Sequence, residues 1–269
     1  MIYDNLSFVI QGILDQRTAA LAASIVQHFP GAEIVQSTNV AGSSPQGPYD
    51  HFVVVNDPEV LDGENNRNLN RLIRTSYDGV FKANNPVVCK LRSDLLFTNN
   101  TLYHSWYNWL ELYQKQFHNE LRIFNCPVAT LNYYTIDPSA PHPFCLPFHP
   151  SDWLMMGQRN EILEYFNIPL KRGDQVYDTE GRLTNRIEQY PALCNLRKHG
   201  FSVPLGFDLD IKHVDITDAY RFLVNNFIVF DMYDTGLQSQ KYQMNPNMEY
   251  LFNNRKWQET SNWLHSICE

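Results

Sequence analysis

The chain has 269 residues, of which 43% are hydrophobic, and its formal net charge is −8 at pH 7. This length and apolar content are enough to form a hydrophobic core. The negative charge disfavours a general nucleic-acid-binding protein, since such proteins need a basic surface, and no segment approaches the roughly 20 consecutive apolar residues of a membrane-spanning helix. The five cysteines are scattered without a CxxC pair, which disfavours a disulfide framework or structural zinc site and favours a reducing, cytoplasmic compartment.

The first hundred residues alternate between predicted strands and helices. Short apolar runs rich in β-favouring residues predict strands, and apolar residues at helical spacing predict helices whose inward side chains include Leu69, Ile73 and Val80. The strands are expected over residues 6–12, 32–38, 50–58 and 85–97, and the helices over residues 16–29 and 66–83. This order predicts a mostly parallel sheet covered by helices.

The second half is less regular. Residues 137–153 are rich in proline, which predicts an irregular functional loop. Helices are expected over residues 101–117 and 184–200, a strand over 126–136, a short strand followed by a helix over 151–166, and a helix running into a strand over 219–237. No internal repeat or clean linker divides the chain, so a single domain over residues 1–269 is predicted.

Charged residues interrupt the apolar run at residues 85–97. Lys90, Arg92 and Asp94 occupy alternate positions, and alternate residues of a strand point to the same face. Two cations and a carboxylate would therefore share one side of a strand end. They could bind a nucleotide diphosphate and a divalent metal, or they could form a strand-end salt bridge with no further role. The spacing alone leaves both interpretations open.

Other strands of the predicted sheet also end in polar residues. Gln11 and Gly12 follow the first strand, and Asn56 and Asp57 follow the third. Ligands of open α/β sheets bind beyond the carboxyl ends of the strands, so these residues are expected near the Lys90–Asp94 segment. The chain has no Walker loop, GxGxxG, HExxH or GxSxG motif, which argues against P-loop ATPases, nicotinamide dehydrogenases and the corresponding hydrolases.

The second half offers its own candidate residues. In the segment HPSDW, Asp152 could act as a general base or simply cap the segment that follows, and Trp153 beside it could offer an aromatic face to a sugar. His149 could bind metal or phosphate, or it could be an ordinary loop histidine. Glu188, expected within a helix, is a second carboxylate candidate, with a solvated helix face as the alternative.

Several segments together resemble the WavE-type lipopolysaccharide-synthesis proteins, which are similar to bacterial glycosyltransferases of the GT-A fold. The resemblance covers about residues 5–245 and is carried by FVIQGILDQRT, FPGAEIVQST, VVVNDP, NRLIRTSYDGV, VCKLRSDLLF and FHPSDWLMMG. It implies an α/β, GT-A-type (Rossmann-like) fold with a mixed, mostly parallel sheet flanked by helices. Residues 1–98 would bind the nucleotide-sugar, and the irregular half at 99–269 would bind the acceptor.

The resemblance implies a glycosyltransferase that moves a sugar from a nucleotide-sugar, with a UDP-sugar favoured, to a glycan or lipid-linked acceptor in surface polysaccharide synthesis. Such an enzyme would be cytoplasmic and could touch the inner face of the inner membrane. The alternatives are a noncatalytic carbohydrate-binding homologue and a nucleotidyltransferase, although the latter usually needs more glycines after the first strand than Gly12 alone.

The resemblance also assigns roles to single residues. GT-A enzymes carry a D-x-D motif that binds Mn²⁺ or Mg²⁺ together with the donor diphosphate, and the matching position reads Arg92-Ser93-Asp94. Asp94 would be the metal ligand, with His149 a second candidate ligand. Because Arg92 replaces the first aspartate, Arg92 or Lys90 could neutralise the diphosphate instead of a metal.

The remaining assignments concern the nucleotide-sugar and the catalytic base. Asp152 would be the base that activates the acceptor hydroxyl, and Glu188 is the next candidate for that role. The nucleotide-sugar would be bound, besides Lys90, Arg92 and Asp94, by Gln11, Gly12, Thr18, Asn70 and Arg71.

Overall fold

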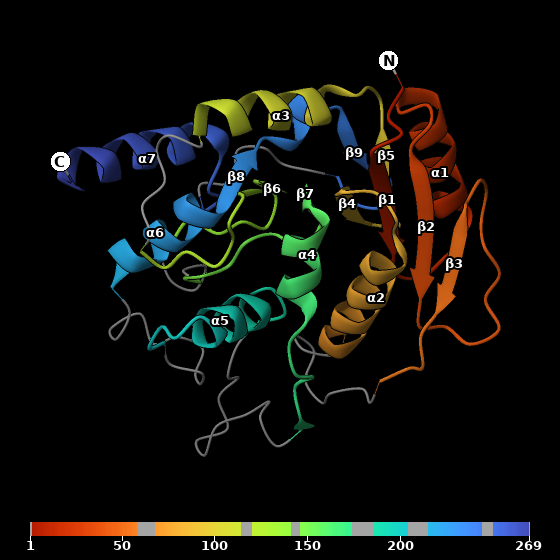
Figure 1. Cartoon of the computed structure of the whole chain (residues 1–269), viewed down its shortest axis with the longest axis horizontal. Coiled ribbons are helices and arrows are strands. Elements are labelled where there is room, and N and C mark those ends of the chain that lie inside the picture. The colour runs from red at the N-terminus through yellow and green to blue at the C-terminus, as the bar shows by residue number, and fades with distance from the viewer. Residues whose placement is uncertain are drawn as a thin grey trace.

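The computed structural model, shown in Figure 1, describes residues 2–58, 68–113, 120–140, 146–173, 186–203, 215–243 and 250–268. Parts of several predicted segments lie outside the described residues: the end of the helix at 101–117, the first residues of the helices at 66–83 and 184–200, and residues 141–145 of the proline-rich loop. The rest of that loop is irregular, as predicted.

A seven-stranded sheet organises the fold, with strand order β3-β2-β1-β4-β7-β6-β8. Only β7 runs antiparallel to its neighbours, whereas the other paired strands are parallel. The strands are β1 Leu6–Gln11, β2 Glu33–Thr38, β3 His51–Val54, β4 Val87–Arg92, β6 Val128–Leu131, β7 Leu154–Gln158 and β8 Phe227–Phe230. The predicted fold class, a mixed and mainly parallel sheet flanked by helices, is confirmed and is consistent with a GT-A-like fold.

The helices described flank this sheet (Figure 1). They are α1 Gln16–His28, α2 Leu69–Lys82, α3 Thr101–Tyr113, α4 Arg159–Phe166, α5 Gln189–Lys198, α6 Ile216–Asn226 and α7 Asn254–Cys268, with a short 3₁₀ helix at Met232–Thr235. Among the described residues, none of these helices combines the length and the apolar character that crossing a membrane would require. Helix α7 was not predicted from the sequence.

The alternation of side chains along β1 explains which helix covers which face. Phe8 packs its ring on Phe29, just after α1, with ring centroids 4.8 Å apart. Val9 points the other way, toward α2, where a Cβ added at Gly79 would lie 2.5 Å from its Cγ1 atom. Because the register pairs Val9 with Lys90, Lys90 is on the α2 side of the sheet.

The predicted strand over residues 85–97 is divided in two. Strand β4 ends at Arg92, and after a turn β5 (Leu95–Phe97) pairs with β9 (Leu237–Ser239) in a separate two-stranded sheet. The last hydrogen bond toward β1 is donated by the amide of Ser93 to Gln11 O at 3.1 Å, and the chain turns at residues 93–94. The prediction that Lys90, Arg92 and Asp94 share one strand face is therefore wrong, because Asp94 lies in the turn.

Further boundaries differ in the second half. The predicted strand over 126–136 is confined to β6, which ends before a turn at Asn132–Thr135, closed by the hydrogen bond from Thr135 N to Asn132 O at 3.0 Å. Glu188 was predicted within a helix, but it immediately precedes α5. It lies in the turn that opens α5, where the amide of Tyr190 donates to the carbonyl of Arg186 at 3.2 Å.

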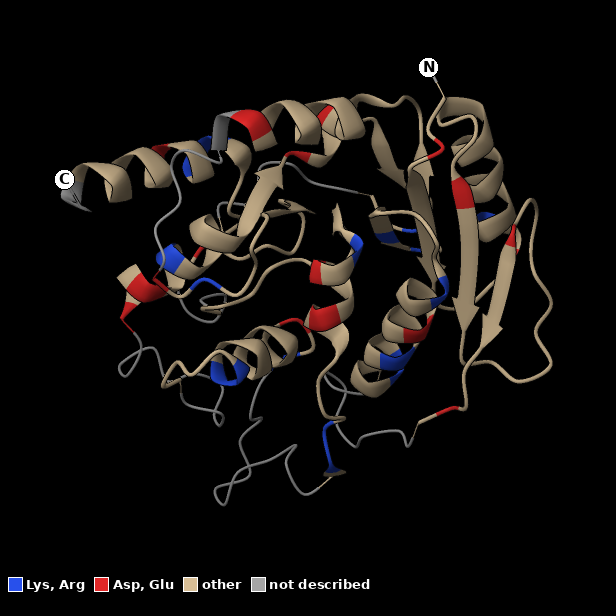
Figure 2. Cartoon of the chain, in the orientation of Figure 1, with Lys and Arg blue, Asp and Glu red and all other residues tan. Residues whose placement is uncertain are grey.

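Figure 2 shows that most charged residues lie on the helices and connections, whereas the strands carry few. Strand β4 is an exception, with Lys90 and Arg92. An ionised group in a sheet needs partners that compensate for lost solvation. The surroundings of the end of β4 therefore point to the functional site.

Candidate functional site

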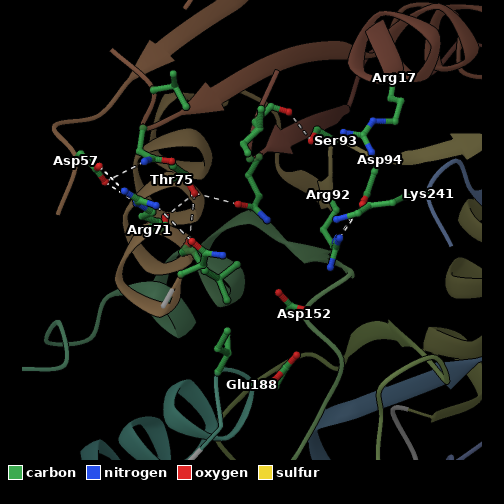
Figure 3. Close-up of a pocket in the computed structure, with 18 of the residues that line it drawn as sticks. Arg17, Asp57, Arg71, Thr75, Arg92, Ser93, Asp94, Asp152, Glu188 and Lys241 are labelled. Carbon is green, nitrogen blue, oxygen red and sulfur yellow. Dashed lines mark hydrogen bonds and ion pairs between the residues drawn. The ribbon is translucent and has the colours of Figure 1, made fainter. Parts of the chain in front are cut away.

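A cavity of about 600 Å³ lies at the carboxyl ends of β1, β2 and β4. Its walls come from the segments that follow these strands and β3, from the first turns of α2, from the residue before α5 and from the segment after β9. This is the edge at which open α/β sheets bind ligands. The side chains lining it that Figure 3 labels are Arg17, Asp57, Arg71, Thr75, Arg92, Ser93, Asp94, Asp152, Glu188 and Lys241.

Gly12 shapes the floor of the cavity. Its φ of 125° is a conformation that side-chain-bearing residues rarely adopt, and a Cβ at this position would lie 3.2 Å from Ser93 Oγ. Gln11 also lines the cavity, with its Oε1 atom accepting a hydrogen bond from Thr75 Oγ1 at 3.0 Å. The structure therefore brings Gln11 and Gly12 to the site, as predicted.

Basic side chains from distant segments meet in the cavity. Arg71 donates to both carboxylate oxygens of Asp57, at 2.7 and 2.6 Å. In Figure 3, Arg17 and Lys241 lie near Arg92 on another side of the cavity. Such a set of guanidinium and ammonium groups suits a phosphate-bearing ligand.

Arg92 is held by several contacts. Its Nε and Nη2 atoms donate to the two carboxylate oxygens of Asp94 at 3.0 and 2.6 Å, and its guanidinium lies over the rings of Trp153 and Tyr242, with Cζ 4.6 and 5.7 Å from their centroids. Burial works to lower the pKa of Arg92, but the hydrogen bonds that it donates to Asp94 and the charge of Asp152 outweigh burial and raise the pKa. Arg92 therefore supplies a permanent positive charge at the cavity wall.

Asp94, the predicted metal ligand, is already paired in this structure. Both carboxylate oxygens of Asp94 accept hydrogen bonds from Arg92. Within the described part of the chain, no group of three or more His, Cys, Asp or Glu side chains is arranged to hold a metal ion. His149 lies elsewhere than on the cavity wall that carries Asp94, so the structure does not bring the two predicted ligands together.

Lys90 was predicted to bind the ligand, but it lies in the protein interior. It is fully buried, and its Nζ atom donates to the backbone oxygen of Asp152 at 2.5 Å and lies 5.5 Å from the ring centroid of Phe166. Burial lowers the pKa of Lys90 to about 8, although Asp152 works to raise it. Because Lys90 does not line the cavity, its charge acts on Asp152 and not directly on a ligand.

Asp152 and Glu188 line the cavity together, and their environments move their pKa values in opposite directions. Burial and the charge of Glu188 raise the pKa of Asp152, more than Lys90 and Arg92 lower it. Burial also works to raise the pKa of Glu188, but the charge and hydrogen bond of His149 outweigh it and keep the pKa low. Two neighbouring carboxyl groups with divergent pKa values are typical of acid–base catalysis.

His149 holds Glu188 in place. Its Nε2 atom lies 3.2 Å from a carboxylate oxygen of Glu188, and its Nδ1 atom lies 2.9 Å from the carbonyl oxygen of Tyr134. In this structure His149, the other predicted metal ligand, is a partner of the Glu188 carboxylate.

Besides Lys90, two further predicted ligand-binding residues do not line the cavity. Thr18 belongs to the N-terminal cap of α1, where its Oγ1 atom accepts from the amide of Asp15 at 3.2 Å. Asn70 makes reciprocal hydrogen bonds with the backbone N and O of Lys171, both 2.9 Å long. In the sequence, a polar side chain in the first turn of a helix looks the same whether it binds a ligand or the backbone.

Other residues of the site were missed by the sequence analysis. Arg17 lies shortly after the first strand, at the start of α1, in a segment that the sequence had already indicated. Its position could therefore have predicted that it lines the cavity. Lys241 gave no such signal, because only the pairing of β5 with β9 brings its segment to the cavity. Thr75, Asn39 and Asn68 complete the polar wall.

Comparison with known proteins identifies the family of the chain. The family model described as WavE lipopolysaccharide synthesis matches residues 6–266, nearly the whole chain. No curated protein gives a significant match. The family match includes every residue assigned here to the cavity. The chain therefore belongs to the WavE lipopolysaccharide synthesis family and has a role in lipopolysaccharide synthesis.

Proposed function

We propose that this protein is a glycosyltransferase that moves a sugar from a nucleotide-sugar, with a UDP-sugar favoured, to a hydroxyl group of a glycan or lipid-linked acceptor. One observation carries the proposal: the same cavity holds basic side chains on one side and a carboxyl pair with divergent pKa values on another. In Figure 3, Asp152 lies just below Arg92, and Glu188 lies farther from Arg17 and Lys241.

On the basic side, the cations would bind the donor diphosphate. Arg92, Arg17 and Lys241 provide the positive charge, and Asp94 keeps the guanidinium of Arg92 in one orientation. When the sugar leaves, negative charge grows on the diphosphate, and fixed cations stabilise it without rearranging. In this proposal Arg92 does the work that a divalent metal does in enzymes with a complete D-x-D motif.

On the carboxyl side, Asp152 would act as the general base. The acceptor oxygen attacks the anomeric carbon, its proton passes to the carboxylate of Asp152, and the bond from the anomeric carbon to the diphosphate oxygen breaks with its electron pair leaving on the diphosphate. A raised pKa makes a carboxylate a better base near neutral pH. Glu188, held by His149, remains the ionised neighbour.

The proposal includes a division of labour along the chain. Residues 1–98 carry most of the donor side of the cavity, while Asp152 and Glu188 come from the half at 99–269 that would bind the acceptor. A lipid-linked acceptor would place the reaction at the inner face of the inner membrane, where a cytoplasmic enzyme meets its nucleotide-sugar donor.

Thermal unfolding with a panel of UDP-, GDP-, CMP- and dTDP-sugars tests the donor. One nucleotide class should raise the midpoint of unfolding, because a ligand that binds only the folded state stabilises it. The rise should be equal in EDTA and in Mn²⁺. Arg92→Met should abolish it, whereas Arg255→Met, which removes a guanidinium from a side chain that is 85% exposed, should not.

Each possible failure has its own meaning. If no nucleotide-sugar shifts the midpoint, the protein is not a donor-dependent transferase, and a noncatalytic carbohydrate-binding role gains support. If the shift requires Mn²⁺, the assignment of Arg92 in place of a metal is wrong. If the donor binds and its nucleotide is transferred intact to another molecule, the enzyme is a nucleotidyltransferase.

A further inference from the structure

We propose that the exposed rings of Tyr134 and Tyr242 form a stacking platform for a pyranose ring of the carbohydrate acceptor. This inference rests on the proposed function and adds to it a binding site and the chemical class of its ligand. It starts from the backbone conformation of Tyr134, which is unusual for a tyrosine.

Tyr134 has a φ of 66°, in the left-handed region. It is the third residue of the turn Asn132–Thr135, which is closed by a hydrogen bond from Thr135 N to Asn132 O. A positive φ at this position of a turn favours glycine or asparagine, and a bulky side chain there costs on the order of 1 kcal/mol. Strain of this kind collects at functional sites, where the surrounding structure maintains it.

Contacts with neighbouring residues hold Tyr134 in this strained conformation. The Nδ1 atom of His149 lies 2.9 Å from the carbonyl oxygen of Tyr134, and the same imidazole contacts Glu188 at 3.2 Å. The strained turn is thus tied to one carboxylate of the cavity. Burial raises the pKa of the Tyr134 hydroxyl, and the charges of Tyr250, Tyr242 and Glu188 raise it further.

Three aromatic rings from different segments meet at this point. The ring of Trp153 lies 5.5 Å from that of Tyr134 and 5.6 Å from that of Tyr242, with interplanar angles of 32° and 38°. Trp153 is only 2% exposed, whereas Tyr134 and Tyr242 are 41% and 39% exposed. The expectation that Trp153 offers a face to a sugar does not hold, because its indole is buried. The two exposed tyrosines that pack against it take this role in the proposal.

The platform is joined to the reacting side of the cavity. Trp153 directly follows Asp152, and the guanidinium of Arg92 lies over the rings of both Trp153 and Tyr242. A sugar stacked on these tyrosines would therefore lie next to the proposed base and next to the cation that faces the diphosphate. Acceptor, base and donor must meet at such a point for direct displacement.

The chemistry of the rings fits a pyranose. One face of many pyranoses presents C–H bonds, which pack on the electron-rich face of an aromatic ring, while the hydroxyl groups around the edge remain free for polar contacts. Apolar rings kept exposed beside polar groups are typical of ligand sites. A nucleobase would also stack on such rings, so the test includes this outcome.

Saturation-transfer NMR with a panel of methyl α- and β-pyranosides of glucose, galactose, mannose and N-acetylglucosamine tests the platform. At least one member should bind the wild-type protein and receive saturation mainly at its ring C–H protons. Tyr134→Gly should weaken that binding by roughly threefold to tenfold, the value of an aromatic contact of about 1 kcal/mol, although glycine relieves the backbone strain.

Matched variants separate the ring from the fold. Tyr134→Phe should bind nearly as well as the wild type, because the aromatic face is kept. Tyr242→Ala, at a position without a positive φ, should weaken binding as Tyr134→Gly does. Tyr107→Ala removes an exposed tyrosine of α3 and should change nothing. Thermal unfolding of each variant shows that it is folded.

The assignment is overturned if no pyranoside binds the wild type, or if binding is unchanged in Tyr134→Gly and in Tyr242→Ala. It is also overturned if Tyr134→Gly removes saturation transfer to the base protons of a bound nucleotide-sugar, because the rings would then hold the nucleobase. Donor binding to the wild-type protein is measured separately, so a protein that binds pyranosides but no nucleotide-sugar refutes the proposed transferase and keeps the platform.

Discussion

At the scale of single residues, the proposed chemistry depends on the difference between two neighbouring carboxyl groups. Asp152 and Glu188 are both half-buried, yet only Glu188 has a histidine against its carboxylate. The histidine keeps Glu188 ionised, and the charge of Glu188 then makes ionisation of Asp152 harder. A proton removed from the acceptor would therefore settle on Asp152.

The first prediction concerns the base. Asp152→Asn keeps the shape of the side chain but cannot accept the proton, so turnover should fall by about 10²- to 10⁴-fold while the donor affinity stays nearly constant. Single-turnover kinetics and the donor-dependent unfolding shift measure the two effects. Near-normal turnover in a folded Asp152→Asn protein, or a product that retains the anomeric configuration of the donor, would show that Asp152 is not the base, and Glu188→Gln would be examined next.

The second prediction concerns pH. The base must be deprotonated, so turnover should decline as the pH falls through the raised pKa of Asp152. Lys90→Met removes a charge that lowers this pKa, so the acidic limb of the pH profile should move to higher pH, on the order of one unit. Glu188→Gln removes a charge that raises it, so the limb should move to lower pH.

These opposite shifts distinguish an electrostatic role of Lys90 and Glu188 from a structural one. A substitution that only disturbs the structure of the site would lower turnover, but it would not move the acidic limb of the pH profile in opposite directions in the two variants. Shifts of the same sign in both variants would refute the assignment of the limb to Asp152. The measurement is kcat against pH with saturating donor and acceptor, together with thermal unfolding at each pH.

At the scale of elements, helix α2 carries part of the donor side of the cavity and lies unusually close to the sheet. Its Gly79 faces Val9 of β1 and Ser37 of β2, and an added Cβ would come within 2.5 Å of Val9 Cγ1 and 3.0 Å of Ser37 Cβ. This close approach positions Arg71 and Thr75, two turns and one turn earlier in the helix, at the strand ends. The glycine therefore serves the packing that builds the site.

The third prediction follows from this packing. Gly79→Ala should destabilise the protein by about 1–3 kcal/mol through overpacking, although alanine is the better helix former by roughly 1 kcal/mol. Urea unfolding measures the change. Gly173→Ala is the control, because nothing lies within 4 Å of a Cβ added there. A neutral or stabilising effect of Gly79→Ala would show that α2 can move away from the sheet without cost.

At the scale of the whole molecule, a buried carboxylate joins helices α6 and α7 to the loop after β6. Asp137, in the loop that leads toward the site, accepts hydrogen bonds from Lys256 of α7 at 2.8 Å and from Tyr220 of α6 at 2.6 Å. Burial works to raise the pKa of Asp137, but the hydrogen bonds from Lys256 and Tyr220 outweigh it and lower the pKa. The carboxylate thus fastens the C-terminal helix to the acceptor half.

The fourth prediction concerns stability in acid. A carboxyl group whose pKa is lower in the folded state stabilises the protein above its unfolded value of about 3.9, and this contribution is lost as the pH falls through the folded value. Asp137→Asn should therefore lower the free energy of unfolding at pH 7 and lose less stability than the wild type as the pH falls below about 4. Chemical unfolding at several pH values measures this, with the exposed Asp4→Asn as the control. Parallel acid-dependence in Asp137→Asn and wild type would refute the role.

The sequence by itself determined the alternation of strands and helices in the first hundred residues, because hydrophobic periodicity and turn residues act locally. It also determined that Gln11, Gly12, Asp57, Arg92 and Asp94 lie near one sheet edge, since parallel strands end on the same side. It did not predict α7, in which the buried Trp257 and Leu264 are separated by polar residues and by the exposed Trp263.

Only the tertiary structure decided what each charged group touches. Lys90 and Arg92 look equivalent in sequence, but the sheet register places Lys90 beneath α4 and Arg92 at the cavity wall. Likewise, Lys241 reaches the site through a strand pairing between distant segments, and His149 meets Glu188 only because separate loops come together. Electrostatic interactions act over a few ångströms in space and are indifferent to separation along the chain, so sequence spacing can nominate charged residues but cannot assign their partners.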